Sequence, residues 1–338
     1  MATFQKTVAW ALHEAPRLRL EVTGHKWVDN WLPGFIDFGV SIDLGTGPIV
    51  GRAVKSSEEE AFGAALSEAI EGFLKRELNL PTSSGLACHA DESSARIAAT
   101  REFIERDSFL CHYLTKTPPE YFDASNLSIG DVPFLALQEK LARFKVKMAL
   151  FLLDARPFDG HVMMCAAFGE GPENPFELII GLGCNETVQA ASEKAVLECL
   201  KNVAAQLEGN GAKPIGLSVF SSLSEYGPSD HYRLGLDRDS SQLLTWLTGR
   251  RKKANEQKAP RREEGSRPFY RIETEIIDID HPALAHAPLC VARAYSDEMQ
   301  PLFFGPTTRN AVNLERLSQF LGRSLAFDEL EPFPHIFG

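Results

Sequence analysis

The spacing of apolar residues along the chain predicts both strands and helices. Apolar runs of strand length, many of them rich in β-branched and aromatic residues, lie at residues 35–44, 48–54, 146–153, 161–168, 177–181, 269–279 and 288–295. A Gly-Thr-Gly turn makes the first two a hairpin. Apolar residues spaced three or four apart predict helices within residues 56–78, 83–107, 181–209, 232–247 and 313–321. Hairpins combined with strand–helix connections indicate an α+β fold.

Three of the predicted helices follow a small-residue turn or a glycine-containing strand and carry acidic side chains. The acidic set is Glu68, Glu71, Glu102, Glu105 and Glu198, and Arg106 directly follows the second pair. Residues three apart lie on the same face of a helix. Carboxylates beside an apolar face need a cation or hydrogen-bond donors to stay charged. One such pair is usually a solvated helix face, but three similar segments indicate a shared site that holds a metal ion and a phosphate.

The last third of the chain contains two segments of unusual composition. Residues 249–267 are densely charged, so we interpret them as a mobile loop or linker. The basic residues at the beginning of this segment could bind an acidic peptide, although a solvated insertion is the simpler interpretation. Residues 329–338 carry Pro332 and Pro334, which favour an extended, polyproline-like tail. Such a tail could insert into a cleft or a partner, or it could pack as an ordinary terminus.

Composition argues against several classes of protein. The chain has 338 residues, of which 44% are hydrophobic, and its net charge of −11 argues against a general nucleic-acid binder. Six cysteines are scattered without a Cys-x-x-Cys pair, which indicates reduced thiols, a cytoplasmic location and no structural zinc site. No segment has the pattern of a signal peptide or a membrane span. His112 and His231 are lone histidines, for which we favour a structural role.

The acidic segments resemble those of the YcaO superfamily. Residues 51–71, residues 83–107 (SSGLACHADESSARIAATREFIERD) and residues 183–198 are similar to the three segments that form the family's ATP site. The second of these segments is the most specific match. Residues 229–247 and 289–305 also look like family segments, so the resemblance extends from residue 35 to the C-terminus. It implies a YcaO-like fold in which the acidic helices converge on one acidic ATP/Mg²⁺ cleft.

The resemblance implies an enzyme that uses ATP and Mg²⁺ to phosphorylate a backbone amide oxygen of a ribosomally synthesised peptide, such as a bacteriocin precursor. In cyclodehydratases a Cys, Ser or Thr side chain attacks the carbonyl and a thiazoline or oxazoline forms. In thioamide-forming members a sulfide attacks instead. The residues that match Mg²⁺-holding positions of the family's ATP site are Glu68, Glu71, Glu102, Glu105 and Glu198, and Arg106 matches a phosphate contact. No catalytic residue is assigned beyond a contribution of Pro332 and Pro334, which partly match the proline-rich ending of azoline-forming members.

The sequence departs from the family pattern close to these positions. Ala64 and Ala98 stand where many family members have serine, and Gly72 stands where many have arginine. Lys201 occupies a position that is often glutamine, and Arg52-Ala53 occupies one that is commonly Lys-Gly. The basic side chain of Lys201 could pair with phosphate or neutralise a metal site. These departures leave open a third interpretation, in which the chain is a divergent subunit that does not use ATP and scaffolds a peptide-modifying complex.

The expected organisation is an N-terminal segment, residues 1–34, followed by one catalytic domain, residues 35–338, built from closely packed halves. No part of the sequence resembles the leader-binding domain that some family members carry. We therefore expect a separate partner to present the precursor peptide, either a leader-binding or E1-like protein or a flavin dehydrogenase of the same pathway. The apolar content is compatible with a homodimer, and neither nucleic acid nor a membrane is an expected partner.

Overall fold

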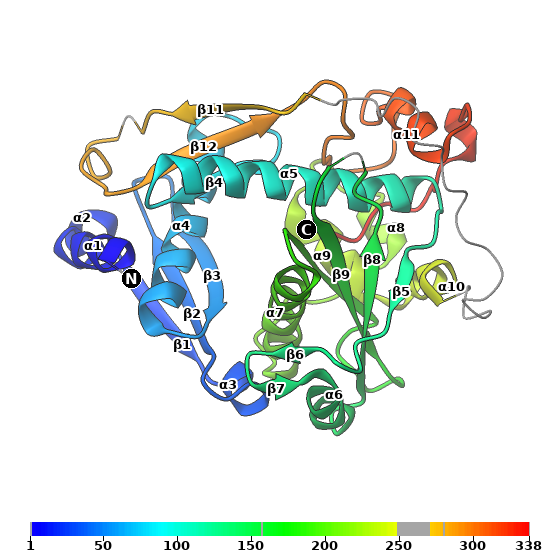
Figure 1. Ribbon diagram of the computed structural model, residues 1–338, viewed down its shortest axis with the longest axis horizontal. Coiled ribbons are helices and arrows are strands. Elements are labelled where there is room, and N and C mark those ends of the chain that lie inside the picture. The colour runs from blue at the N-terminus through cyan, green and yellow to red at the C-terminus, as the bar shows by residue number, and fades with distance from the viewer. Residues whose placement is uncertain (1, 157, 249–270, 280, 338) are drawn as a thin grey trace. The chain divides into compact units, whose positions relative to one another are not determined.

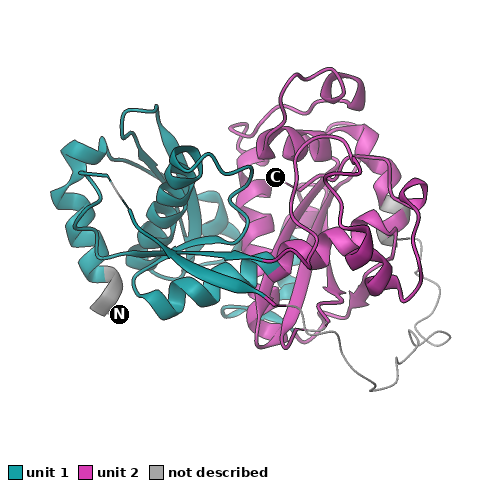
Figure 2. Ribbon diagram, turned by 90° about the horizontal axis from the view of Figure 1, so that it is seen from above, with its two compact units in different colours: residues 1–103, 127–140, 272–295 teal, residues 104–126, 141–271, 296–338 magenta. Residues whose placement is uncertain are grey.

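The computed structural model describes residues 2–156, 158–248, 271–279 and 281–337. The chain forms two compact units, each made of several chain segments (Figure 2). Unit 1 comprises residues 1–103, 127–140 and 272–295, and unit 2 comprises residues 104–126, 141–271 and 296–338. The chain therefore passes from one unit to the other several times.

Helices and strands are mixed along the chain, and the α+β fold class is confirmed (Figure 1). The helices are α1 (Ala2–His13), α2 (Ala15–Leu18), α3 (Trp27–Trp31), α4 (Glu58–Glu77), α5 (Glu92–Leu114), α6 (Phe134–Ala142), α7 (Val188–Leu207), α8 (Leu217–Phe220), α9 (Pro228–Leu236), α10 (Ser241–Thr248) and α11 (Leu314–Leu321), with 3-10 turns η1 (Arg238–Ser240) and η2 (Phe327–Glu329). The strands are β1 (Glu21–His25), β2 (Ile36–Ile42), β3 (Ile49–Lys55), β4 (Leu86–His89), β5 (Glu120–Phe122), β6 (Ser128–Ile129), β7 (Val132–Pro133), β8 (Val146–Leu153), β9 (His161–Gly169), β10 (Leu178–Asn185), β11 (Glu273–Ile277) and β12 (Cys290–Tyr295).

Unit 1 contains two three-stranded antiparallel sheets and the helix α4. The first sheet has the order β1-β2-β3, and the β2–β3 pair confirms the predicted hairpin. The second has the order β11-β12-β4, so β4 pairs with a strand about two hundred residues further along the chain. The apolar face of α4 buries Leu66 and Ile70 in the same core as Val40 and Ile42 of β2. This packing fixes the orientation of the α4 face that carries Glu68.

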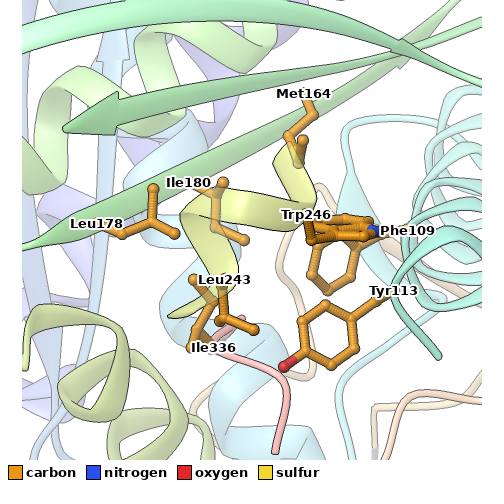
Figure 3. A pocket seen from close by; sticks show the side chains of 8 residues that line it. All are labelled: Phe109, Tyr113, Met164, Leu178, Ile180, Leu243, Trp246 and Ile336. Atoms are coloured by element: carbon orange, nitrogen blue, oxygen red, sulfur yellow. The ribbon is translucent and has the colours of Figure 1, made fainter. Parts of the chain in front are cut away.

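Unit 2 is built on an antiparallel sheet of order β10-β9-β8-β5. The helix α7 packs on β9 and β10. The opposite face of the sheet contributes Met164, Leu178 and Ile180 to a small apolar pocket (Figure 3). The remaining lining of that pocket comes from α5, α10 and the C-terminal tail: Phe109, Tyr113, Leu243, Trp246 and Ile336. Because both faces of the sheet are covered, β9 and β10 are apolar almost throughout instead of alternating with polar residues.

The same strand–helix contact occurs once in each unit. A Cβ atom at Gly51 of β3 would lie 2.0 Å from the carbonyl oxygen of Ala65 in α4, and one at Gly181 of β10 would lie 2.4 Å from that of Ala195 in α7. Only glycine therefore lets the helix backbone approach the strand so closely. The same step of 130 residues separates Gly51 from Gly181 and Ala65 from Ala195. It also relates the two N-caps, Ser57 of α4 and Thr187 of α7.

Two predicted helices differ from the structure. The segment after the turn at residues 83–85 begins with strand β4, because Leu86–His89 pairs with β12, and helix α5 starts only at Glu92. The single helix expected at residues 232–247 is divided into α9 and α10. The cause is Asp237, which is extended and accepts a 3.0 Å hydrogen bond from the backbone of Asp239 to cap η1.

The tail is packed within unit 2, as one of its two interpretations expected. Phe333, His335 and Ile336 are all buried. The Tyr113 hydroxyl lies 3.0 Å from the carbonyl oxygen of Phe333 and 2.9 Å from that of Pro334. The charged segment 249–267 lies outside the described residues. The division into an N-terminal segment and one catalytic domain stays a prediction.

Candidate functional site

The acidic pair of α4 is held by backbone amides of unit 1. The Ser57 hydroxyl caps α4 by accepting a 3.3 Å hydrogen bond from the backbone of Glu60. Glu68 Oε2 accepts a 3.0 Å hydrogen bond from the backbone N–H of Arg52 in β3. Glu71 Oε1 accepts one of 2.6 Å from the backbone N–H of Cys88 in β4. These amide hydrogen bonds orient one oxygen of each carboxylate, and carboxylates are oxygen ligands of the kind that Mg²⁺ binds.

The Arg52 side chain forms an ion pair of its own. Its Nε and Nη2 atoms donate to the two oxygens of Asp37 at 2.8 Å and 2.6 Å. Asp37 is only 1% exposed, so this bidentate pair is largely shielded from water. The arginine that departs from the family's Lys-Gly pattern thus pairs with β2, while its backbone amide holds Glu68.

The second acidic pair lies on α5, and the two residues belong to different units. Glu102 is half-buried in unit 1, whereas Glu105 of unit 2 is 2% exposed. Both oxygens of Glu105 bind cations: Oε1 accepts from Arg106 Nη1 at 3.0 Å, and Oε2 accepts from Lys194 Nζ at 2.8 Å. Burial disfavours the charge on Lys194, but the Glu105 carboxylate outweighs it and raises the pKa of that ammonium. Lys194 is therefore a charged member of the site that the sequence reasoning missed.

Glu198 and Lys201 complete this group in unit 2. Lys201 Nζ lies 2.8 Å from Glu198 Oε2, one helical turn away on α7. Burial opposes ionisation of Glu198, yet Lys201 first, and then Lys194 and Arg106, lower the pKa of that carboxyl. We call the five residues Glu105, Arg106, Lys194, Glu198 and Lys201 the charged cluster of unit 2. A signal for Lys194 existed in the sequence, because it stands four residues before Glu198 on the same helix face.

The C-terminal tail reaches the charged cluster through Arg106. The Arg106 guanidinium carbon lies 4.0 Å from the centroid of the Phe337 ring, a cation–π contact. The two histidines considered from the sequence are buried and bonded to backbone. His112 bonds the carbonyl oxygen of Thr117, and His231 Nε2 accepts from the backbone of Gly305. Both contacts agree with a structural role.

The six sequence-predicted residues are distributed over the two units. Glu68, Glu71 and Glu102 lie in unit 1, and Glu105, Arg106 and Glu198 lie in unit 2. Among the described residues, no group of three or more His, Cys, Asp or Glu side chains is close enough to hold a metal ion. Convergence of all six on one acidic cleft therefore stays a prediction. No helix in the described part of the chain is long and apolar enough to cross a bilayer.

Comparison with protein families gives one match. The family model described as YcaO cyclodehydratase, ATP- and Mg²⁺-binding, matches residues 71–271, which is more than half of the chain. No curated protein sequence matches the present chain.

Several solved structures share the fold at low sequence identity. A heterocyclase in complex with substrate and cofactor superposes on 98% of this chain with a TM-score of 0.65 and 12% identity, and the chain spans 57% of that protein's length. YcaO from Methanopyrus kandleri bound with AMPPCP and Mg²⁺ has a TM-score of 0.50 at 15% identity, covering 63% of this chain and 70% of that one. A chain of the Escherichia coli microcin synthetase McbBCD complex has a TM-score of 0.51 at 11% identity, and the match covers 78% of the present chain and 85% of that one. These likenesses establish the fold.

The donor chemistry of the chain fits the nucleotide and metal that the sequence led us to expect. Carboxylates such as Glu68 and Glu71 are ligands that Mg²⁺ prefers, and guanidinium and ammonium groups such as Arg106 and Lys194 bind phosphate oxygens. ATP and Mg²⁺ are also the ligands named in the description of the matching family. The chain belongs to the YcaO cyclodehydratase family.

Proposed function

We propose that this protein uses ATP to activate backbone amides of a ribosomally synthesised peptide, as a cyclodehydratase that converts Cys, Ser or Thr residues to thiazoline or oxazoline rings. The observation that carries the proposal is the family match over residues 71–271. That segment contains five of the six predicted site residues: Glu71, Glu102, Glu105, Arg106 and Glu198.

The reaction requires that an amide oxygen become a leaving group. The substrate side chain adds its sulfur or oxygen to the carbonyl carbon and gives up its proton. The former carbonyl oxygen departs as phosphate, and the amide nitrogen loses its proton as the ring C=N bond forms. Bound ATP with Mg²⁺ supplies the phosphoryl group that makes this departure possible and neutralises its charge.

The chain's own residues would bind and orient the reactants. The predicted ligands of Mg²⁺ remain the five glutamates of the sequence analysis, Glu68, Glu71, Glu102, Glu105 and Glu198, and amide hydrogen bonds orient the two on α4. In unit 2, Arg106 would contact phosphate. Its guanidinium is fixed by Glu105 on one side and by the ring of Phe337, which limits the rotamers that it can adopt.

Partners are part of the proposal. The Escherichia coli microcin synthetase, whose structure shares this fold, is a complex. We expect the present chain to require a leader-binding, E1-like or flavin dehydrogenase partner, to act in the cytoplasm on a precursor peptide, and to be able to form homodimers. All six cysteines are free thiols in the structure, which is compatible with a reducing compartment.

The test is reconstitution with a candidate precursor peptide and the proteins encoded beside it. The mixture receives ATP and Mg²⁺, and the peptide is analysed by mass spectrometry for loss of one water per modified residue. The matched variant is Glu102→Gln, which removes a carboxylate charge and keeps the side-chain shape. Glu92→Gln, in the exposed first turn of the same helix, is the control.

The outcomes separate the proposed chemistry from its alternatives. Ring formation that is lost in Glu102→Gln and kept in Glu92→Gln supports cyclodehydration. Exchange of oxygen for sulfur would show a thioamide-forming enzyme instead. A product that forms equally well without ATP, or with Glu102→Gln, would contradict ATP-dependent activation at this site and favour a scaffolding subunit.

A further inference from the structure

The edge strands of the two three-stranded sheets in unit 1 differ in how their outward-facing backbone groups are bound. The four edges are β1 and β3 of one sheet and β11 and β4 of the other. At three of them a side chain binds a backbone group: Glu68 the N–H of Arg52 in β3, Glu71 the N–H of Cys88 in β4, and Arg96 the carbonyl oxygen of Thr274 in β11. Side chains of unit 1 therefore cap these three edges against another strand.

The fourth edge, β1, directs the backbone groups of Val22 and Gly24 outward. The Arg52 N–H points away from β2, so its register partner Gly39 directs its own backbone groups toward β1. Thr23 lies opposite Gly39 and bonds β2, and the alternate residues Val22 and Gly24 therefore face the other way. In the part of the chain that the structure describes, no hydrogen bond reaches these outward groups.

Strand β1 also lacks the features that usually protect an edge strand from pairing. It lies on the side of β2 opposite to β3 (Figure 1), and residues 21–24 are exposed on both faces of the sheet. Its five residues pair with β2 in unbroken register, without a bulge, and none of them is proline or lysine. Val22 is 48% exposed although it is apolar. A regular and uncovered edge of this kind accepts a further strand.

The backbone of β1 is complementary to a second copy of itself. A two-fold axis through Thr23 places Val22 opposite Gly24 of the second copy, and Gly24 opposite Val22 of the second copy. Both of these are hydrogen-bonded pairs, because Val22 and Gly24 carry the outward N–H and C=O groups. Every outward backbone group of the two strands is then satisfied.

The side chains of β1 fit the same register. Glu21 lies opposite His25 of the second copy at both ends of the paired strands, so like charges do not meet. The ring of Phe38 lies beside Gly24, where a Cβ atom would be 3.6 Å from Phe38 Cε1. Val22 of the second copy would lie opposite this glycine and add its methyl groups to the apolar face that Phe38 begins.

We propose that two copies of this chain pair through β1, antiparallel about Thr23, and so join their three-stranded sheets into one sheet of six strands. The proposal deepens the proposed function, because it rests on the homodimer included there and assigns a surface to it. A second copy fits this edge better than an unrelated extended peptide, because backbone and side chains of the same five residues are complementary in a single register.

A cysteine crosslink tests the register. In the proposed dimer Thr23 faces itself in a non-hydrogen-bonded pair, in which Cα atoms lie about 4.5 Å apart, within the range of a disulfide. With oxidised glutathione, Thr23→Cys should form a disulfide-linked dimer, as two protein thiols are oxidised and one glutathione disulfide is reduced to two thiols. Glu21→Cys, on the same exposed strand, is the matched control, because its two copies would lie about 13 Å apart. The wild type, treated in parallel, accounts for the native cysteines.

Sedimentation velocity of the full-length chain over a range of concentrations measures the dimer itself. Val22→Pro removes an outward N–H and keeps the ladder to β2, so it should weaken dimerisation at least about tenfold. Val22→Thr keeps the N–H and the β-branched shape and should stay within about threefold of the wild type. Circular dichroism melting establishes that each variant is folded. Should Val22→Pro fail to fold, Gly24→Lys replaces it, because a lysine on an edge strand opposes pairing.

Three results would overturn the proposal: a wild type that is monomeric up to about 100 µM, a dimer that Val22→Pro leaves intact, or Thr23→Cys that crosslinks no faster than Glu21→Cys. A monomer whose Val22 and Gly24 amides become protected from hydrogen exchange only after a precursor peptide is added would also overturn it, and would assign the edge to the peptide. The crosslinking and sedimentation measurements involve neither ATP nor turnover. Failure of this interface is therefore distinguishable from failure of the proposed cyclodehydration.

Discussion

Two stacked histidines in unit 2 make the stability of the protein depend on pH in a predictable direction. His231 and His335 are 0% and 1% exposed, and their ring centroids are 4.1 Å apart. His231 Nε2 accepts a 2.7 Å hydrogen bond from the backbone of Gly305, so Nδ1 carries the proton and bonds the carbonyl oxygen of His335. The Nε2 of His335 bonds the carbonyl oxygen of Phe303. A proton added to His231 Nε2 would break the bond to Gly305.

The magnitude follows from the pKa values. Burial lowers the pKa of His231 from 6.5 to about 4. Burial, together with the neighbouring His231, lowers the pKa of His335 to about 3. Because the unfolded chain binds these protons first, the stability is fully present above about pH 6.5 and is lost as the pH falls toward the folded-state values. Between about pH 7.5 and about pH 5, the free energy of unfolding should fall by about 2 kcal/mol for each histidine.

Urea unfolding, followed by tryptophan fluorescence at a series of pH values, measures this loss. His335→Gln should remove about 2 kcal/mol of the decrease, which is the share of one of the two stacked histidines, since glutamine does not titrate. His286→Gln, at an exposed position, makes the same chemical change and serves as the control. The reasoning would be refuted if the free energy of unfolding fell equally steeply with decreasing pH in the wild type, His335→Gln and His231→Gln, because the decrease would then come from other groups.

Two further predictions concern packing in unit 2. Arg316→Met should lower the free energy of unfolding by about 3–5 kcal/mol in urea, because it leaves the fully buried Asp107 carboxylate without the guanidinium that contacts both of its oxygens. The double variant Arg316→Met/Asp107→Asn should lose clearly less free energy of unfolding than the sum of the losses in the two single variants. Strictly additive losses would argue against an ion pair between the two side chains. Gly181→Ala should cost at least about 1–3 kcal/mol, because its Cβ would lie 2.4 Å from the Ala195 carbonyl oxygen. Gly24→Ala, whose Cβ would meet only ordinary contacts, should stay within about 1 kcal/mol in the same assay, and equal effects of the two would count against the close-approach argument.

The elements that the sequence predicted well are those whose signals are local. The strand–helix segments around α4 and α7 combine an apolar period, a Ser or Thr cap and a strand glycine within about thirty residues, so their presence could be predicted from neighbouring residues. The boundary before α7 was less accurate, because β10 runs to Asn185, four residues beyond the predicted strand. The strand β4 has only four residues and no period, and it exists because β12 pairs with it. A short strand that depends on a distant partner leaves no pattern in its own sequence.

The site was predictable in its residue types and less so in its charge balance. The acidic residues were found because they recur at helical spacing. The role of Glu105 could not be predicted, because the two cations that it binds come from the next residue on α5 and from α7. Similarly, the contact between Arg106 and Phe337 joins residues far apart in the chain, and only the fold reveals it.

The interleaving of the two units has a consequence for how the chain is synthesised and folded. β4 emerges from the ribosome early, but its partner β12 follows about two hundred residues later. Asp107 likewise cannot form its ion pair until Arg316 has been synthesised. Neither unit can therefore close cotranslationally until nearly the whole chain has been made, and the nascent protein exposes unpaired strand edges in the meantime. We expect its yield of folded protein to depend on chaperone supply and growth temperature more than that of a chain whose domains follow one another in sequence.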